Sequence, residues 1–203
     1  MMKYLKEMVQ ANLIIKKSEF IGILYPIETD LDIEEAIIDA KKRYPKATHY
    51  VTATIRGERG EYASSNDDGE PSRTAGFPIL EVLMKNNLTN VLCVVIRYFG
   101  GIKLGAGGLI RAYSSSASEV LKVASLYTKV KARKYAITFP YNLVDTIKHL
   151  LNEKTKIVDE SYMQHVTFTF IFFEGGIEVL DDIIHQIISV NELALETLHI
   201  DVT

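Results

Sequence analysis

The sequence predicts an α+β protein built from two domains, and three observations support this prediction. Strand and helix patterns alternate along the 203 residues, as is typical of a mixed fold. The last third shows the order strand, helix, strand, strand, helix, strand, which is that of the split-βαβ, ferredoxin-like fold. The charge also changes sign: residues 1–134 carry 20 Lys and Arg against 15 Asp and Glu, whereas residues 135–203 carry 3 against 11. We therefore predict domains at 1–132 and 133–203, with the boundary in the basic segment Lys129–Lys134.

The first half of the first domain shows one helix among strands. Apolar residues at helical spacing predict the helix at Asp32–Tyr44, with Asp32 and Glu35 as its capping pair and Pro45 at its end. Alternation of apolar and polar residues predicts a half-buried strand at Thr48–Ile55. Further strands are predicted at Ser18–Tyr25, which Pro26 ends, and at Glu61–Ser64, which follows a glycine turn.

The second half of the first domain begins with a polar loop, Ser65–Gly76. Pro78 suits the first position of a helix, and the apolar run Val91–Ile96 predicts a strand that is buried on both faces. The segment Gly100–Gly108 then has five glycines in nine residues. It precedes a helix whose apolar stripe begins at Leu109.

The second domain is predicted to have one central core strand. Alternate residues from Val166 to Phe172 are apolar and share one face, which is typical of such a strand. The ferredoxin-like fold serves many unrelated functions, so it does not identify an activity. The predicted elements are strand Tyr135–Phe139, helix Asn142–Leu151, strands Thr155–Glu160 and Val166–Phe173, helix Ile177–Ile188 and strand Leu193–Ile200.

Composition indicates a cytoplasmic protein without membrane contact. The single cysteine, Cys93, lies in an apolar run and has no partner for an intrachain disulfide. No apolar run approaches the roughly 18 residues that a membrane-spanning helix needs. The N-terminal segment Met1–Glu7 carries charges where a signal peptide has its apolar core.

The polar loop contains three carboxylates within four residues, Asp67, Asp68 and Glu70. Carboxylate oxygens are the ligands that Mg²⁺ and Ca²⁺ prefer, so these three residues are candidate metal ligands. The alternative is a solvated turn in which Asn and Asp bond to their own backbone. No pattern predicts a catalytic group or a cofactor. The residues of this candidate ligand-binding turn are Asp67, Asp68, Glu70, Ser72, Arg73 and His49, although His49 also suits a structural role at the edge of the core.

The glycine-rich segment lies between a buried strand and a helix N-terminus, where backbone N–H groups and the helix dipole favour an anion. Its candidate phosphate- or nucleic-acid-binding residues are Arg97, Lys103, Gly105, Gly107, Gly108 and Arg111. We expect the three glycines to need backbone angles or close contacts that a Cβ would disturb, and tight loop packing alone is the alternative. Arg97 ends the buried strand, so it is expected to pair with a carboxylate such as Glu70. Tyr98 and Phe99 are placed to stack on a base.

The two candidate segments and several shorter ones form a longer pattern. Its parts are Lys17-Ser18, Phe20-Ile21, Ala47–His49, Asp67–Ser72, Thr74–Gly76, Arg97–Gly105, Gly107–Leu109 and Arg111–Tyr113. This pattern resembles the signature of the IMPACT/YigZ family and covers most of residues 15–125. Arg73 departs from it, because similar proteins usually carry glycine at that position.

The resemblance implies a fold for each domain and a link to translation. The first domain is expected to share the fold of the second domain of a small-subunit ribosomal protein and of domain IV of elongation factor G. The second domain is expected to be similar to the ferredoxin-like last domain of elongation factor G, and the two-domain layout resembles the bacterial form. Eukaryotic relatives regulate translation by binding a partner of a stress-activated initiation-factor kinase.

We therefore expect a non-enzymatic cytoplasmic protein that binds RNA or the ribosome, with phosphates on the glycine segment and a basic protein partner on the acidic second domain. One alternative is an enzyme or binder of a small phosphorylated ligand, metal-assisted, in a cleft between the Asp67–Glu70 turn and the Gly105–Gly108 loop. Another is a protein-interaction module. A turn that faces the loop across one cleft favours the small ligand, whereas a basic stripe away from the turn favours RNA.

Overall fold

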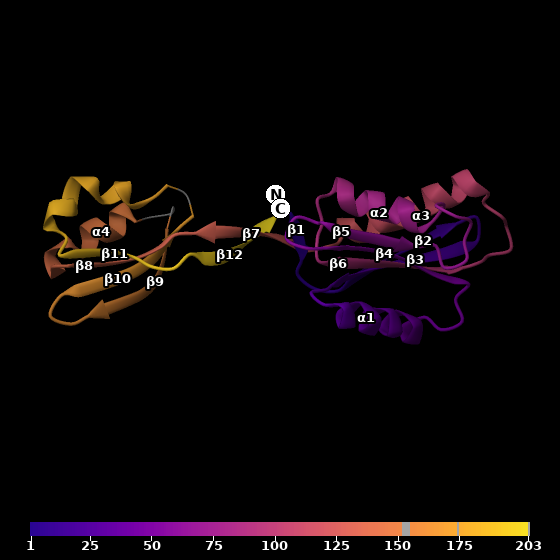
Figure 1. The fold of residues 1–203 in the computed structure, drawn as a ribbon, viewed down its shortest axis with the longest axis horizontal. Coiled ribbons are helices and arrows are strands. Elements are labelled where there is room, and N and C mark those ends of the chain that lie inside the picture. The colour runs from indigo at the N-terminus through magenta and orange to yellow at the C-terminus, as the bar shows by residue number, and fades with distance from the viewer. Residues whose placement is uncertain (152–154, 174, 203) are drawn as a thin grey trace. The chain divides into compact units, whose positions relative to one another are not determined.

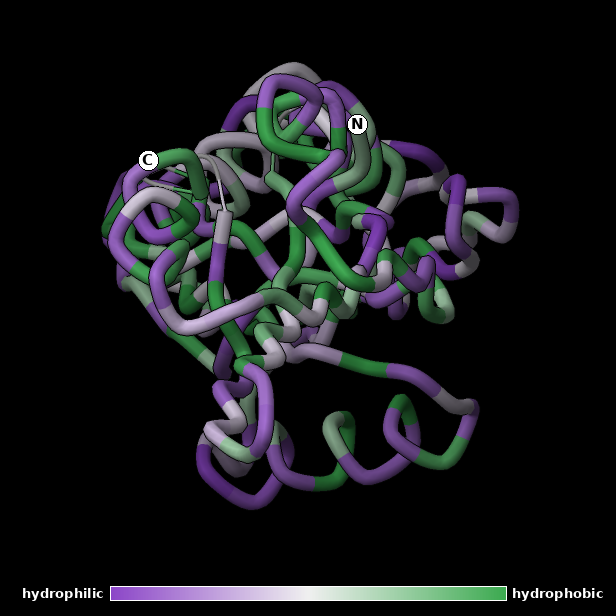
Figure 2. The backbone as a smooth tube through the Cα atoms, turned by 90° about the vertical axis from the view of Figure 1, so that its left-hand side faces the viewer, coloured by the Kyte–Doolittle hydropathy of each residue, from purple (hydrophilic) through white to green (hydrophobic). Residues whose placement is uncertain are grey.

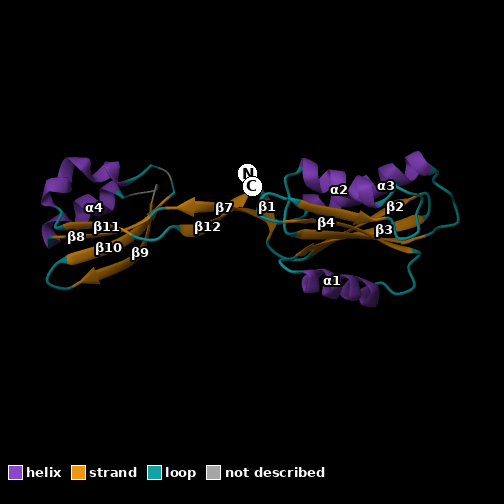
Figure 3. Cartoon of the chain, in the orientation of Figure 1, coloured by secondary structure: helices purple, strands orange, loops and turns teal. Residues whose placement is uncertain are grey.

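The computed structural model describes residues 1–151, 155–173 and 175–202. The chain forms two compact units, one of Met1–Lys129 with the residues from Ile200 onward, the other of Val130–His199. Helices and sheets occur in both (Figure 3), so the predicted α+β class and the two-domain organisation are confirmed. The sequence does not predict the return of the chain to the first unit at Ile200.

The first unit is built on a five-stranded antiparallel sheet with the order β2-β3-β6-β4-β5. The central strand β6 is buried from Val91 to Arg97, because both faces of the sheet are covered. The strands are β2 (Val9–Ile15), β3 (Ser18–Pro26), β4 (His49–Arg56), β5 (Tyr62–Asn66) and β6 (Val91–Tyr98).

Helix α1 (Asp30–Arg43) covers one face of this sheet, and α2 (Gly76–Lys85) and α3 (Ala106–Lys122) cover the other (Figure 1). Successive residues of a strand point to opposite faces, so each face has its own core. The core under α1 includes Ile21, Ile23, Leu92 and Ala40. The core under α2 and α3 includes Phe20, Cys93, Leu83 and Tyr113.

Helix α1 begins with a capping box that differs from the predicted one. Thr29 Oγ1 accepts from the N–H of Asp32 at 3.3 Å, and Asp32 Oδ2 accepts from the N–H of Thr29 at 2.7 Å. The predicted pair of Asp32 and Glu35 is therefore wrong, because Asp32 is the second member of the box and Thr29 the first. Figure 2 shows hydrophobic and hydrophilic residues alternating along this helix, as a half-buried helix requires.

The second unit contains a four-stranded antiparallel sheet with the order β11-β8-β10-β9. The predicted central strand is confirmed, because β10 lies between β8 and β9 and both Phe168 and Phe170 are fully buried. The elements are β8 (Lys134–Phe139), the 3₁₀ helix η1 (Tyr141–Leu143), α4 (Val144–Leu150), β9 (Thr155–Tyr162), β10 (Val166–Phe172), the 3₁₀ helix η2 (Ile177–Gln186) and β11 (Ser189–Glu192).

A separate three-stranded sheet has the order β1-β7-β12, with β1 at Lys3–Leu5, β7 at Leu126–Ala132 and β12 at Glu196–Val202. The strand predicted at Leu193–Ile200 corresponds to β12 but starts three residues too early, and the preceding strand β11, which ends at Glu192, is not predicted. The strands β1, β2 and β7 are not predicted from the sequence. Among the described helices, none combines the length and the apolar character needed to span a membrane.

Candidate functional site

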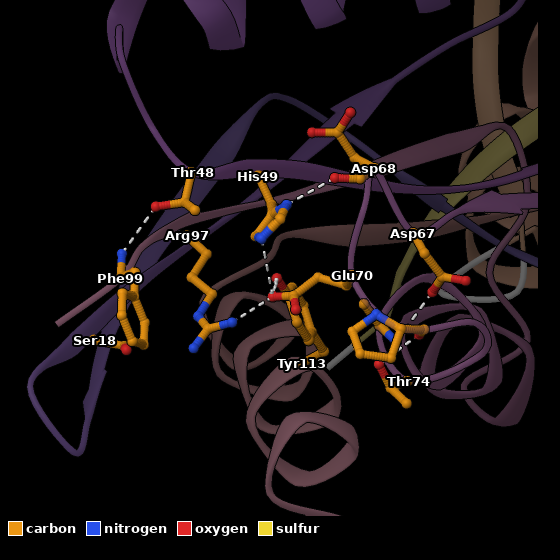
Figure 4. Close-up of polar contacts among 12 residues, drawn as sticks. Ser18, Thr48, His49, Asp67, Asp68, Glu70, Thr74, Arg97, Phe99 and Tyr113 are labelled. Atoms are coloured by element: carbon orange, nitrogen blue, oxygen red, sulfur yellow. Dashed lines mark hydrogen bonds and ion pairs between the residues drawn. The ribbon is translucent and has the colours of Figure 1, made fainter. Parts of the chain in front are cut away.

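A buried carboxylate occupies the centre of the candidate site. The side chain of Glu70 is 4% exposed, and its Oε1 accepts from Arg97 Nη1 at 2.5 Å and from the Tyr113 hydroxyl at 2.7 Å (Figure 4). Arg97 belongs to β6 and Tyr113 to α3, so this carboxylate joins the turn that carries it to the sheet and to the helix. The expected pairing of Arg97 with Glu70 is confirmed.

The surroundings of Tyr113 keep its hydroxyl protonated. Burial raises the pKa of Tyr113 far above its usual value, and the hydrogen bond to Glu70 raises it further. The phenol therefore stays a donor to the carboxylate. A buried charged group has lost its hydration, and only a partner of opposite charge compensates for this loss. The pair of Glu70 and Arg97 is therefore stable only while both members are present.

His49 lies beside this pair, because it is paired with Arg97 in the register of β4 and β6. Its Nδ1 lies 2.7 Å from the backbone oxygen of Asp68, and a carbonyl oxygen only accepts, so Nδ1 carries a hydrogen. Its Nε2 lies 3.8 Å from Glu70 Oε1. The histidine thus links the strand to the turn.

The acidic turn is held by its own carboxylates. Asp67 Oδ1 accepts from the N–H groups of Ala75 at 3.1 Å and Gly76 at 2.8 Å, and its Oδ2 accepts from the N–H of Arg73 at 2.8 Å. Asp67 therefore satisfies the first N–H groups of α2, which begins at Gly76, so the predicted helix start at Pro78 is two residues late.

The carboxylate of Asp68 is engaged as well, since its Oδ2 accepts from the N–H of Tyr50 at 2.6 Å. The described residues contain no group of three His, Cys, Asp or Glu side chains arranged to hold a metal ion. Backbone bonding of the turn thus describes Asp67 and Asp68 better than metal binding.

The glycine segment ends in the first turn of α3. Gly105 precedes the helix with φ +69°, a left-handed angle that favours glycine. The N–H of Leu109 donates to the backbone oxygen of Gly105 at 2.9 Å, and within the described part of the chain no side-chain cap is found at this helix start. These groups, on Ala106, Gly107 and Gly108, point out of the helix end.

The three glycines differ in what a side chain would meet. A Cβ on Gly108 would lie 3.0 Å from Leu104 Cβ, whereas a Cβ on Gly107 would meet no atom within 4 Å. Gly107 has an ordinary helical conformation as well, so the expectation that all three positions exclude a Cβ is wrong for Gly107.

The turn and the start of α3 face each other across one pocket of about 450 Å³. The turn contributes Glu70 and Pro71 to its wall. Strands β4 and β6, with the residues next to them, contribute Thr48, His49, Arg97 and Phe99. The start of α3 and the chain before it contribute Lys103, Leu104, Gly105, Ala106 and Leu109. Arg97 is 5% exposed, and its Nε has no hydrogen-bond partner among the described residues. A buried N–H donor without an acceptor is rare, so this Nε is an exception among the buried polar groups.

The predicted site residues fall into two groups. Five of them line the pocket: His49, Glu70, Arg97, Lys103 and Gly105. The others lie outside its lining: Asp67, Asp68, Ser72, Arg73, Gly107, Gly108 and Arg111. Sequence reasoning missed Thr48, Pro71, Leu104, Ala106 and Leu109 as lining residues, and it placed Tyr113 only in the core.

Arg73 occupies a backbone position that suits glycine. Its φ is +62°, in the left-handed region, and its guanidinium lies 4.2 Å from the centre of the Phe77 ring. The cation–π contact compensates part of the cost of this conformation.

Comparisons with known proteins agree with the pattern of these segments. Residues 16–121 match the Impact N-terminal domain. The IMPACT family member YvyE of Bacillus subtilis is 42% identical over 164 residues, which are 80% of this chain and 76% of that protein. The IMPACT family member YigZ of Escherichia coli is 33% identical over 157 residues, 75% of this chain and 76% of its own. A crystal structure of a hypothetical protein covers 97% of this chain and 98% of its own, with a TM-score of 0.60 and 27% identity.

Proposed function

The chain belongs to the IMPACT family, and from this premise we propose that it is a non-enzymatic, cytoplasmic protein that acts in translation by binding RNA, on the ribosome, through phosphate groups. The link to translation that the family resemblance implies supports this role. The cytoplasmic location rests on Cys93, a lone cysteine whose burial raises the pKa of its thiol to about 12. Such a thiol is inert and has no structural disulfide to form.

One observation carries the proposal, which is that positively charged side chains and the N–H groups of a helix start converge on one pocket. The N–H groups at the start of α3, the ammonium of Lys103 and the guanidinium of Arg97 belong to it or adjoin it. Phosphate oxygens accept from such donors, and the positive end of a helix favours their charge. Contacts of this kind position RNA without reading its bases.

The state of Glu70 supports a binding protein over an enzyme. Its Oε1 is occupied by Arg97 and Tyr113, which makes Glu70 a structural anchor of the pocket wall. A general base instead needs a carboxylate that is free to take a proton from a bound substrate.

The salt dependence of RNA binding tests the proposal. On single-stranded RNA the logarithm of affinity falls with the logarithm of salt by about 0.7 per phosphate contact. Lys103→Ala should therefore weaken binding about equally for all sequences and make this slope shallower by about 0.7. Lys85→Ala is the control, because Lys85 is exposed in the last turn of α2 and lies outside the pocket. Equal slopes for both variants and the unaltered protein would overturn the proposal.

A small phosphorylated ligand in the same pocket is the second candidate, and the facing of turn and helix start across one pocket favours it. Metal assistance is not part of it, since Asp67 and Asp68 bond to backbone N–H groups. A nucleoside monophosphate that binds with micromolar affinity, while RNA binds weakly and unchanged by Lys103→Ala, would support this candidate.

The second unit is proposed to bind a protein partner. Its segment 130–199 carries 6 basic against 10 acidic residues, so its net negative charge disfavours phosphate and suits a basic protein surface. A protein-interaction role of this kind adds to RNA binding by the first unit. Binding to purified ribosomes should then weaken when acidic residues of this segment are replaced by their amides.

A further inference from the structure

The hairpin that joins β2 to β3 turns on two lysines. Ile15 pairs with Ser18, so Lys16 and Lys17 alone form the turn, with φ of +45° and +68°. Both side chains are exposed, and neither has an ion-pair partner among the described residues. Asn and Gly usually occupy such a turn, because they tolerate these angles. Two adjacent positive charges therefore project at this tip at a conformational cost.

This tip adjoins the rim of the phosphate pocket. The N–H of Gly100 donates to Ser18 Oγ at 3.1 Å, and a Cβ on Gly100 would lie only 1.9 Å from the backbone oxygen of Lys17. Phe99, the residue before Gly100, lines the pocket. The lysine turn, Phe99 and the pocket thus follow one another along the same end of the sheet.

Phe99 is the ring that this arrangement exposes. It is 45% exposed, its N–H donates to Thr48 Oγ1 at 3.0 Å, and the guanidinium of Arg97 lies 5.4 Å from its ring centre. A large aromatic ring beside cations is the usual platform for an unpaired base. Tyr98 is not placed to stack on a base, because its hydroxyl donates to the backbone oxygen of Pro45 and it lies outside the pocket lining.

We propose that a single strand of RNA follows this path, with one phosphate at the start of α3 and Lys103, one base stacked on Phe99, and the next phosphates at Lys16 and Lys17. The inference rests on the proposed function and specifies its substrate as single-stranded. A duplex keeps its bases stacked inside and offers no free face to Phe99. The cations follow the backbone, and the ring selects unpaired bases.

A variant of the lysine turn tests this path, because it removes two positive charges and should not destabilise the fold. Lys16→Asn with Lys17→Gly restores the residues that this turn prefers, so the protein should be at least as stable. Its salt slope on a ten-nucleotide single-stranded RNA should be shallower by about 1.4, the equivalent of two lost phosphate contacts. Lys85→Gln with Lys122→Gln removes the same charge from the far ends of α2 and α3 and should leave the slope unchanged.

Phe99→Leu separates stacking from charge. It should weaken binding to the single strand about 5- to 100-fold and leave the salt slope unchanged, because no cation is lost. Binding to a ten-base-pair duplex should be weaker than to the single strand and indifferent to Phe99→Leu.

The outcomes distinguish a failure of the strand path from a failure of the proposed function. If the slope responds to Lys103→Ala but not to the lysine-turn variant, and Phe99→Leu leaves the affinity for the single strand unchanged, the pocket binds phosphate and the strand path is wrong. If Lys103→Ala also has no effect, the proposed function itself fails. Equal affinities for duplex and single strand, with Phe99→Leu inactive on both, would likewise overturn the single-strand assignment.

Discussion

Glu70 and Arg97 are 27 residues apart in the chain, yet their side chains meet at 2.5 Å in the interior, where each is less than 10% exposed. This pair ties the turn that carries Glu70 to the central strand of the sheet. The same contact orients the guanidinium that lines the pocket, so folding and the proposed binding depend on one interaction.

Replacing one member of this pair should destabilise the protein more than replacing both. Glu70→Gln leaves the Arg97 charge buried without its partner, and the free energy of unfolding should fall by about 3–5 kcal/mol. The double variant Glu70→Gln with Arg97→Met removes the stranded charge and should recover part of this loss. Urea unfolding followed by circular dichroism measures both. A single variant that loses less than about 1 kcal/mol would show that the pair is dispensable.

The raised pKa of Tyr113 predicts how stability changes in alkali. Burial and the Glu70 hydrogen bond keep the folded pKa of Tyr113 above the unfolded value of 10.0, so the folded state holds a proton that the unfolded state releases above that pH. Stability from this group is complete below pH 10 and falls by about 1.4 kcal/mol per pH unit above it. Tyr113→Phe should reduce the steepness of that fall by this amount, whereas Tyr62→Phe at an exposed position should not. Parallel curves for Tyr113→Phe and the unaltered protein between pH 10 and 11 would contradict the assignment.

Asp67 should act as the cap of α2. Its Oδ1 bonds to two N–H groups at the helix start, so Asp67→Ala should lower the free energy of unfolding by about 1–2 kcal/mol. Ser72→Ala changes an exposed residue of the same turn and should cost less than about 0.5 kcal/mol. Differential scanning calorimetry compares the two. A larger effect of added Mg²⁺ or Ca²⁺ on the unaltered protein than on Asp67→Ala would instead restore the metal interpretation.

Arg73 offers a test of backbone conformation against side-chain contact. Arg73→Ala loses the contact with Phe77 and keeps a non-glycine residue at φ +62°, so it should be destabilising. Arg73→Gly loses the same contact and relieves the left-handed conformation, so it should be more stable than Arg73→Ala by about 1 kcal/mol. Thermal unfolding of the two variants decides this, and the reverse order would mean that the left-handed conformation at this position carries no strain that glycine relieves.

Local patterns in the sequence predict most strands and helices of the first unit, and they fail where a partner far along the chain decides. The buried strand β6 shows itself as an unbroken apolar run, and the positive charge at its end anticipates the pairing of Arg97 with Glu70. In contrast, β1 and β7 are short or rich in charge, and they exist as strands because they pair with each other. Strands of three and seven residues are too short for their apolar periodicity to reveal such pairing.

The residues of the candidate site also fall into those that the sequence predicts and those that only the fold reveals. Its polar members can be found from residue type, because carboxylates and glycines cluster in the sequence. Its apolar walls, Leu104 and Leu109, look like ordinary core residues until the fold places them opposite Pro71. The use of Asp67 as a helix cap is also hidden, since it requires the chain to return over nine residues to Gly76.

Gly107→Ala should separate the stability of α3 from its binding of phosphate. Gly107 lies in the first turn of the helix with ordinary backbone angles, and an added Cβ meets no atom within 4 Å. Alanine forms helix better than glycine, so the free energy of unfolding should rise by up to about 1 kcal/mol.

The Cα–Cβ bond of a helical residue tilts toward the N-terminus, so the new methyl group stands where a phosphate would approach the free N–H groups. RNA affinity should therefore fall by about tenfold, the equivalent of one charge-assisted hydrogen bond. Ser115→Ala, in the middle of α3, is the matched control that should leave affinity unchanged. A Gly107→Ala protein that is more stable and binds RNA as well as before would show that phosphate does not bind at this helix end.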